Sequence, residues 1–207
     1  VATAIRHMGR ATNQALADLG DEATHESLVE TAWNWRGSVD IWVNNAGVDV
    51  LTGRLAEATF AEKLDRLWQV DVRATIQLSR MIGHRMRNHR KEQLATHEKG
   101  FEPRSEPVIL NMGWDQAQLG MGGESGEIFS AIKGAVIAFS LSLAQSLAPD
   151  VRVNCLAPGW IRTAWGETAS DYWQDRAKAE SLMQRWGEPE DVARAALFLA
   201  SPAAGFI

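Results

Sequence analysis

Residues 39–47 read VDIWVNNAG, a short apolar run closed by the polar and small residues NNAG. The same combination of an apolar run and a turn recurs at 108–113 (VILNMG) and at 151–159 (VRVNCLAPG). Short runs that are apolar almost throughout are typical of strands covered on both faces. Segments with helical periodicity separate them, so the sequence predicts an α/β fold with a parallel, doubly wound sheet.

The remaining elements are assigned outward from these strands. A helix over 25–36 is predicted, with Thr24 as its N-cap and Gly37 as its stop; Pro189 opens a last helix that runs to about Ala200. Further strands and helices follow from periodicity and bounding glycines: strands over 11–19, 39–44, 108–112 and 151–156, and helices over 1–8, 57–66, 67–87 and 128–147. Two segments remain, an inserted solvated loop over 88–106 and a Trp-rich covering segment over 160–186. No repeat or linker divides residues 1–207, so we expect a single domain.

The composition excludes several classes of protein. The chain has 207 residues, of which 45% are hydrophobic and 23% charged, so a disordered chain is excluded. The net charge of −5 gives no electrostatic case for nucleic acid or an anionic membrane as a partner. The single cysteine, Cys155, allows no intrachain disulfide and favours a reducing, cytoplasmic location. The longest small and apolar stretch, 134–148, falls short of the roughly 20 apolar residues of a membrane helix.

Ligands bind such sheets at the carboxyl ends of the strands. The candidate ligand-binding residues are therefore Asp18 and Leu19, and those in the turns at 44–47, 113–115 and 158–160. Lys133 lies on an otherwise apolar helix face, where a lone ammonium is costly to bury. The alternatives are that the glycines and prolines form ordinary strand-to-helix turns, and that Lys133 is a surface lysine with a buried stem.

Taken together, these motifs resemble the short-chain dehydrogenase/reductase family. The resemblance rests on NNAG (44–47), FSAIKGA (129–135), RVNCLAPG (152–159), RWGEPEDVA (185–193) and FLAS (198–201). It implies a Rossmann-type, three-layer α/β/α fold that binds NAD or NADP. It also implies hydride transfer between the nicotinamide and a carbonyl or alcohol carbon, with no metal.

The resemblance assigns cofactor contacts to particular residues. Asp18, with Leu19 beside it, matches the acidic residue that contacts the adenine ring. Lys133 matches the lysine that holds the nicotinamide ribose and lowers the pKa of the catalytic tyrosine in the family. The other matching positions are Asn45, Ala46 and Gly47 under the adenosine ribose, and Pro158, Gly159, Ile161 and Thr163 beside the nicotinamide.

The catalytic positions depart from the family pattern. Phe129 stands where the family has its catalytic tyrosine, Trp114 where it has a serine and Asp71 where it has an asparagine; Lys133 alone is retained. General acid–base catalysis typically contributes about 10²–10⁴-fold, and Phe129 has no proton to give. We therefore expect impaired or altered catalysis. The alternative is a non-catalytic member, a pseudoenzyme that serves as a binding or structural subunit.

A few other groups are possible substitutes. Asp115, Glu124 and Glu127 flank the site in sequence, and Asp71 is a carboxylate beside Lys133 that fits a structural ion pair better than an acid–base role. Tyr172, the only tyrosine, lies in the covering segment and is a weak candidate for reaching the nicotinamide.

The resemblance also implies parts that this sequence lacks. The Gly-rich turn after the first strand, the second strand and the last strand are absent, roughly 40 residues by comparison with the family's βαβ halves. A sheet without its central first strand exposes two edges. We expect a fragment of a longer chain; the alternative is a natural truncation stabilised by a partner.

Two further features have open interpretations. The segment around 84–106 holds His84, His89 and His97, but their spacing matches no common zinc pattern, so a solvated loop that affects assembly is favoured. The aromatic residues of the covering segment either line an apolar pocket or pack a lid: Trp160, Trp165, Trp173 and Trp186. The helices at 67–87 and 128–147 match those that pair across the family's two-fold interfaces, which implies a homodimer or homotetramer.

Overall fold

The computed structural model describes residues 1–96 and 106–207. Three strands, β1 (Ile41–Asn44), β2 (Val108–Met112) and β3 (Arg152–Leu156), form a parallel sheet in the order β1-β2-β3. The described α-helices are α1 (Ala2–His7), α2 (His25–Arg36), α3 (Gly53–Ala56), α4 (Phe60–Leu67), α5 (Thr75–Thr96), α6 (Gln116–Leu119), α7 (Glu124–Leu147), α8 (Ala164–Thr168), α9 (Asp171–Glu180) and α10 (Pro189–Ala200). A π-helix (Trp68–Ala74) joins α4 to α5, and 3₁₀ turns cover Glu22–Thr24 and Pro202–Ala204.

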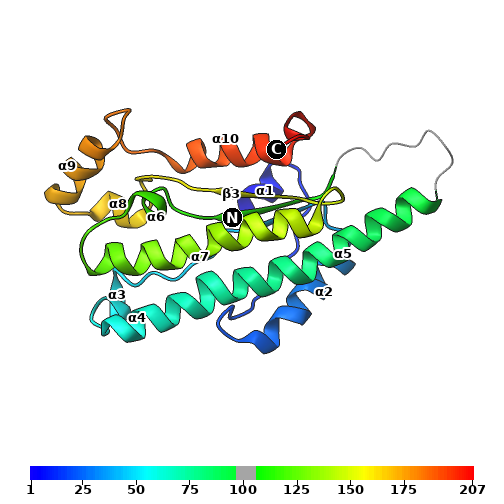
Figure 1. Cartoon of the computed structure of the whole chain (residues 1–207), viewed down its shortest axis with the longest axis horizontal. Helices are drawn as coiled ribbons and strands as arrows, with labels where there is room; N and C mark the ends of the chain where they lie inside the picture. Colours follow the sequence, from blue (N-terminus) through cyan, green and yellow to red (C-terminus); the bar gives the residue numbers. More distant parts are fainter. Residues whose placement is uncertain (97–105) are drawn as a thin grey trace.

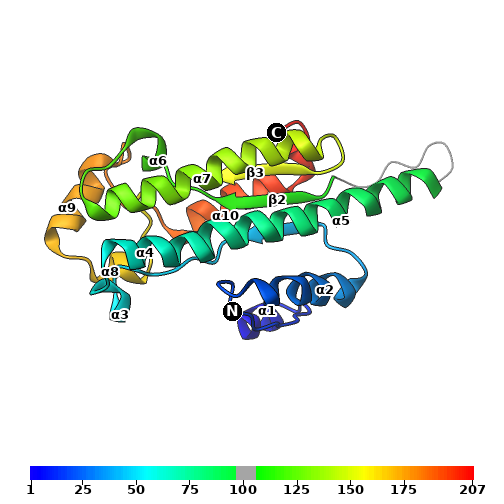
Figure 2. The same cartoon turned by 60° about the horizontal axis from the view of Figure 1, so that its bottom comes forward.

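Helices cover both faces of the sheet. α5 and α7 cross one face, and α10 lies on the opposite face, so the predicted α/β/α layering is confirmed (Figure 1). α2 packs against α5 and lies with α1 beyond the edge of β1 (Figure 2). In the register, Asn44 of β1 lies beside Asn111 of β2, and Met112 lies beside Leu156 of β3. The carboxyl ends of the three strands therefore meet at one edge.

Apolar residues at helical spacing build the core between the sheet and its helices. On α5, Leu78, Ile82 and Met86 are buried at four-residue intervals, and α7 repeats the interval from Ile128 to Ile132. By length and composition α7 is apolar enough to cross a membrane. The expectation that the longest apolar stretch is too short for a membrane helix is therefore wrong. In this structure α7 packs against β3, α4 and α5.

A buried polar network ties β1 and β2 to the helices behind them. The Asn44 amide donates to Asn111 Oδ1 and to Ser79 Oγ, both at 2.8 Å. The Asn111 amide donates to Ser140 Oγ at 2.9 Å, and Trp42 Nε1 donates to Asn44 Oδ1. Asn111 and Ser79 are fully buried, so water cannot reach their polar atoms. The hydrogen bonds within the network satisfy these atoms instead.

Several sequence expectations are wrong in detail. Residues 11–19 form no strand, because among the described residues no strand lies beside them to complete a ladder. Thr24 does not cap α2 through its side chain; its hydroxyl donates to the carbonyls of Asp18 and Asp21. The stretch 57–87 is divided between α4, the π-helix and α5. Residues 88–96 are helical rather than looped, because α5 continues to Thr96, whereas His97 and the rest of 97–105 lie outside the described residues.

Two glycines on α7 give a matched test of the packing. A Cβ on Gly126 would overlap the carbonyl oxygen of Met121, whereas a Cβ on Gly134 meets nothing within 4 Å. We expect Gly126→Ala to destabilise the fold by about 1–3 kcal/mol, since the loop before α7 must shift. Gly134→Ala should stabilise it by up to about 1 kcal/mol through helix propensity. Urea unfolding of both variants is the measurement, and equal stabilities would contradict the packing described.

Candidate functional site

The turns that follow the three strands lie side by side. The Gly113 N–H, after β2, donates to the carbonyl of Leu156 at 2.6 Å, and the Asp115 N–H donates to that of Pro158 at 3.2 Å. These bonds extend the pairing of β2 and β3 beyond the strands. The structure thereby brings the predicted site residues after β2 next to those after β3.

Asp71 connects the turn after β1 to α7. It lies in the π-helix, and its side chain is only 4% exposed. Its Oδ2 accepts from Lys133 Nζ at 2.8 Å and its Oδ1 accepts from the Val48 N–H at 3.0 Å. A Cβ on Gly47 would lie 2.9 Å from Asp71 Oδ2, so a glycine is needed for this close approach. The π-helix, a form often found at functional sites, directs Asp71 inward.

Trp114 and Phe129 meet at this edge. Their ring centroids are 6.2 Å apart with an interplanar angle of 73°, an edge-to-face contact. Phe129 precedes Lys133 by one turn of α7. Both rings are half-buried, and neither offers an O–H group. The two positions predicted to depart from the family pattern therefore form one apolar wall.

The predicted contacts for the adenosine half of a dinucleotide are only partly assembled. Leu19, Asn45 and Ala46 line one small cavity of about 130 Å³. Asp18 is exposed; its carboxylate accepts from the Gly20 N–H at 2.8 Å and from Arg66 at 3.2 Å. The Gly20 hydrogen bond, followed by the Arg66 guanidinium, lowers the pKa of the Asp18 carboxyl.

The predicted contacts for the nicotinamide half gather in a second cavity. Pro158, Ile161 and Thr163 line an apolar cleft of about 440 Å³ together with α10. Asn45 borders this cleft as well as the smaller cavity, so it lies between the two halves. Gly159 is not among the residues that line the cleft. It faces Asp115, whose Oδ2 lies 2.8 Å from the position that a Cβ on Gly159 would take.

The aromatic rings of the covering segment pack against one another. Neighbouring centroids in a ring of four tryptophans are 5.8–6.4 Å apart: Trp160, Trp173, Trp165 and Trp186. Trp186 is only 2% exposed. This packing favours the lid interpretation over an aromatic-lined pocket. Tyr172 is 63% exposed and packs on Trp173, and Arg176 donates to its hydroxyl, so these contacts hold it at the surface of α9.

The carboxylates that flank the site differ in their surroundings. Lys63 pairs with Glu124 at 3.3 Å, and Glu127 is exposed. Asp115 is half-buried, and this burial raises the pKa of its carboxyl although the Gln116 N–H opposes the change. Burial also raises the pKa of the Cys155 thiol. Among the described residues, no group of three or more His, Cys, Asp and Glu side chains is arranged to hold a metal ion.

One positioning residue gives no signal in the sequence. His25 is buried at the start of α2, and its Nε2 lies 3.0 Å from the carbonyl oxygen of Leu19. Its Nδ1 lies 2.6 Å from Gln77 Oε1 on α5. This contact fixes the turn that carries Asp18 and Leu19. Neither periodicity nor a motif marks His25, because the contact joins segments that are about 50 residues apart in the chain.

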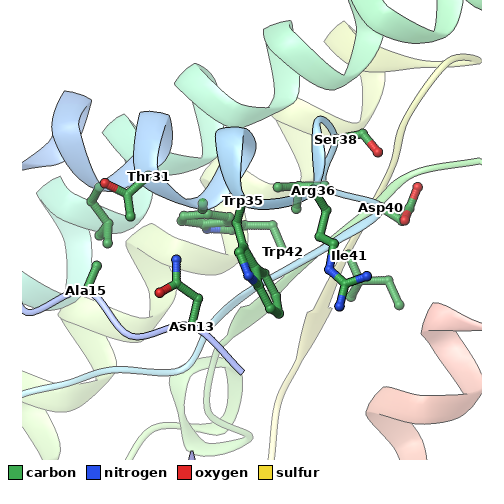
Figure 3. A pocket seen from close by; sticks show the side chains of 12 residues that line it. Asn13, Ala15, Thr31, Trp35, Arg36, Ser38, Asp40, Ile41 and Trp42 are labelled. Atoms are coloured by element: carbon green, nitrogen blue, oxygen red, sulfur yellow. The ribbon is translucent and has the colours of Figure 1, made fainter. Parts of the chain in front are cut away.

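A larger cavity than these two lies away from this edge. A groove of about 580 Å³ runs between α2, the segment before Asp18, and β1, with Trp35, Arg36 and Trp42 around it (Figure 3). Ile41, which lines this groove, is about half exposed, and β1 has no neighbour on its outer side among the described strands. Its position separates this groove from Lys133, so we place the chemical site at the carboxyl edge of the sheet instead.

Comparisons with known proteins agree with this architecture. A family model described as Enoyl-(Acyl carrier protein) reductase matches residues 1–207. "Dehydrogenase/reductase SDR family member 4" of Sus scrofa is 30% identical over 207 residues, which cover 96% of this chain and 66% of that protein. "Tropinone reductase-like 3" of Erythroxylum coca is 27% identical over 184 residues, 88% of this chain and 64% of that protein. The chain thus spans about two thirds of the length of these relatives.

Solved structures show the same fold. The 3-ketoacyl-(acyl-carrier-protein) reductase from Brucella melitensis, complexed with NADH, is 30% identical with a TM-score of 0.75, over 92% of this chain and 72% of that one. A short-chain dehydrogenase/reductase mutant from Serratia marcescens is 28% identical with a TM-score of 0.78, over 100% of this chain and 76% of that one.

The Asp71–Lys133 pair predicts a measurable coupling. Lys133→Met leaves a buried carboxylate without its cation, and we expect a loss of about 3 kcal/mol in the free energy of unfolding. Adding Asp71→Asn should recover part of that loss, so the double variant is more stable than the sum of the single effects. Arg73→Met, which breaks the exposed pair with Glu22, serves as the control and should cost less than about 1 kcal/mol. Additive effects of the two buried substitutions would show that the pair does not interact.

Proposed function

The chain belongs to the short-chain dehydrogenase/reductase family, and we propose that it binds a nicotinamide dinucleotide at the carboxyl edge of its sheet with impaired or altered carbonyl/alcohol chemistry. The contact between Trp114 and Phe129 is the observation that supports impaired or altered chemistry. It replaces two oxygen-bearing side chains with an apolar wall. The similar reductase from Brucella melitensis was solved with NADH, and a similar blue fluorescent protein from a metagenomic library was solved with NADPH, which supports the proposal of dinucleotide binding.

The residues present fit such a cofactor on the nicotinamide side, whereas the contacts for its adenosine half are only partly assembled. Asn45 borders both the adenosine-side cavity with Leu19 and the nicotinamide-side cleft with Pro158 and Thr163. Gly47 allows the chain to pass directly over Asp71. The dinucleotide supplies or accepts a hydride when bound. Asp18 carries a lowered carboxyl pKa, so it is a charged acceptor at neutral pH for an adenine amino group.

Lys133 is poorly placed to replace the missing acid. Its ammonium is held by the Asp71 carboxylate at 2.8 Å, which directs it toward the turn after β1. Phe129 has no hydroxyl through which the lysine acts in the family. A loss of general acid catalysis costs about 10²–10⁴-fold, so turnover at neutral pH is expected to be slow.

The second candidate function is a non-catalytic subunit that binds cofactor or a partner. The closed ring of tryptophans in the covering segment favours it, because a packed lid restricts access to the edge. We further propose a cytoplasmic homodimer or homotetramer joined through α5 and α7. Ala131 and Ala138 are exposed on α7, and their small side chains permit close packing of a second helix.

Fluorescence titration with NADH and NADPH tests the binding proposal. We expect saturable binding of at least one of the two, together with slow reduction of a panel of aldehydes and ketones. The double variant Phe129→Tyr with Trp114→Ser should raise turnover by at least about 10²-fold, because it restores the acid and the oxygen anchor.

Tyr172→Phe is the matched control, since it removes the chain's only natural tyrosine from an exposed position. It should change neither binding nor turnover. Failure to bind either cofactor would overturn the proposed function. Wild-type turnover equal to that of the double variant would show that the chemistry is not impaired.

A further inference from the structure

At the edge of the sheet where the strands end, Asp115 is a carboxylate that forms no ion pair with any described residue. Asp71 is committed to Lys133 and Glu124 to Lys63, and Glu127 faces solvent. Asp115 makes no ion pair among the described residues, yet it is half-buried. A half-buried carboxyl without a cation is unusual, because burial penalises its charge.

The two oxygens of Asp115 have different surroundings. Oδ1 accepts from the Gln116 N–H at 2.7 Å, which fixes the side chain at the start of α6. Oδ2 has no hydrogen-bond partner among the described residues and points at Gly159, 2.8 Å from where a Cβ would be. Gly159 has an ordinary backbone conformation, so the approach of Asp115 is what excludes a side chain there.

Asp115 also lies between the aromatic wall and the turn after β3. It directly follows Trp114, whose ring meets Phe129, and its own N–H holds the carbonyl of Pro158. Pro158 lines the apolar cleft after β3, so Asp115 adjoins that cleft through this turn.

The surroundings of this carboxyl raise its pKa and so shift its equilibrium toward the protonated form. Burial is the main cause of its raised pKa, and the charge of Glu180 adds to it. Glu180 is itself held in place by Trp160 Nε1 at 2.9 Å and by Arg176 Nε at 2.6 Å. The Gln116 N–H acts in the opposite direction. A neutral carboxyl can donate a hydrogen bond, which a carboxylate cannot.

We propose that Asp115 is the proton donor for carbonyl reduction in this chain, in place of a phenol at position 129. The inference rests on the proposed function. Asp115 donates its proton to the carbonyl oxygen of an aldehyde or ketone while the carbonyl carbon receives a hydride from the reduced nicotinamide dinucleotide, which is thereby oxidised. The carbonyl π electrons form the new O–H bond. Asp115 is left as a carboxylate and regains a proton from solvent.

The proposal predicts an unusual pH dependence. The active form is the protonated carboxyl, so kcat/KM for reduction falls as the pH rises through the pKa of Asp115, by about tenfold for each pH unit above it. Asp115→Asn should lower kcat/KM by at least about 10²-fold at the acid end and remove this dependence. The amide can still accept from Gln116, so the fold is retained. Glu127→Gln, which alters an exposed flanking carboxylate, should leave the rate and the pH profile unchanged.

A second readout does not depend on turnover. In protein labelled with ¹³C at the aspartate carboxyl carbon, one signal that is absent from Asp115→Asn should titrate above the ordinary aspartate range. A titration of that signal within or below the ordinary range would overturn the proposal, even if Asp115→Asn failed to fold well enough for assay.

The outcomes separate this inference from the function on which it rests. If neither reduced dinucleotide binds, the proposed function fails and the role of Asp115 fails with it. If a dinucleotide binds but the wild type reduces no carbonyl compound, or Asp115→Asn matches the wild type in rate and pH profile, only the role of Asp115 is overturned. Unchanged dinucleotide affinity in Asp115→Asn, together with the lost acid activity, supports it.

Discussion

The buried carboxylate of Asp71 is the contact on which the carboxyl edge of this fold depends. It accepts from the backbone of Val48 in the turn after β1 and from Lys133 on α7, while its own backbone belongs to the π-helix between α4 and α5. Three segments far apart in the sequence are thereby held at one point. A carboxylate that is 4% exposed is tolerated only with such partners. The same contact that organises the edge also occupies the one catalytic side chain that the family pattern retains.

The rest of the edge follows from that arrangement. With Lys133 turned toward Asp71, the space before it is bounded by Phe129 and Trp114, which supply surface but no proton. Asp115 comes next along the chain from Trp114 and lies against Gly159, where burial raises the pKa of its carboxyl. An altered acid is thus a consistent reading of a site whose usual acid is absent.

Local sequence signals predicted some elements closely. The apolar run VILNM predicted β2 with its observed bounds, and Pro189 with Glu190 and Asp191 in the first turn predicted α10. The segment 11–19 has strand composition but forms no strand, because pairing depends on a neighbour and not on composition. The polar residues of 88–96 indicated a loop, yet α5 continues through them; Trp33 packs on His89 and Lys91 pairs with Asp150. Such support from distant residues leaves no local signal. The candidate site shows the same division: the motifs proposed Lys133, Phe129 and Trp114 as site positions, whereas the choice of Asp115 over Glu124 and Glu127 required their surroundings in three dimensions.

A crystal structure of the chain grown with NADH or NADPH would test the central claim most directly, namely that the edge still holds a dinucleotide while Lys133 remains bound to Asp71. The account predicts a dinucleotide that passes Asn45, with its nicotinamide beside Pro158 and Gly159 and with the Asp71–Lys133 contact intact. A dinucleotide seated instead in the groove beside β1, or a Lys133 that has left Asp71 for the ligand, would contradict it.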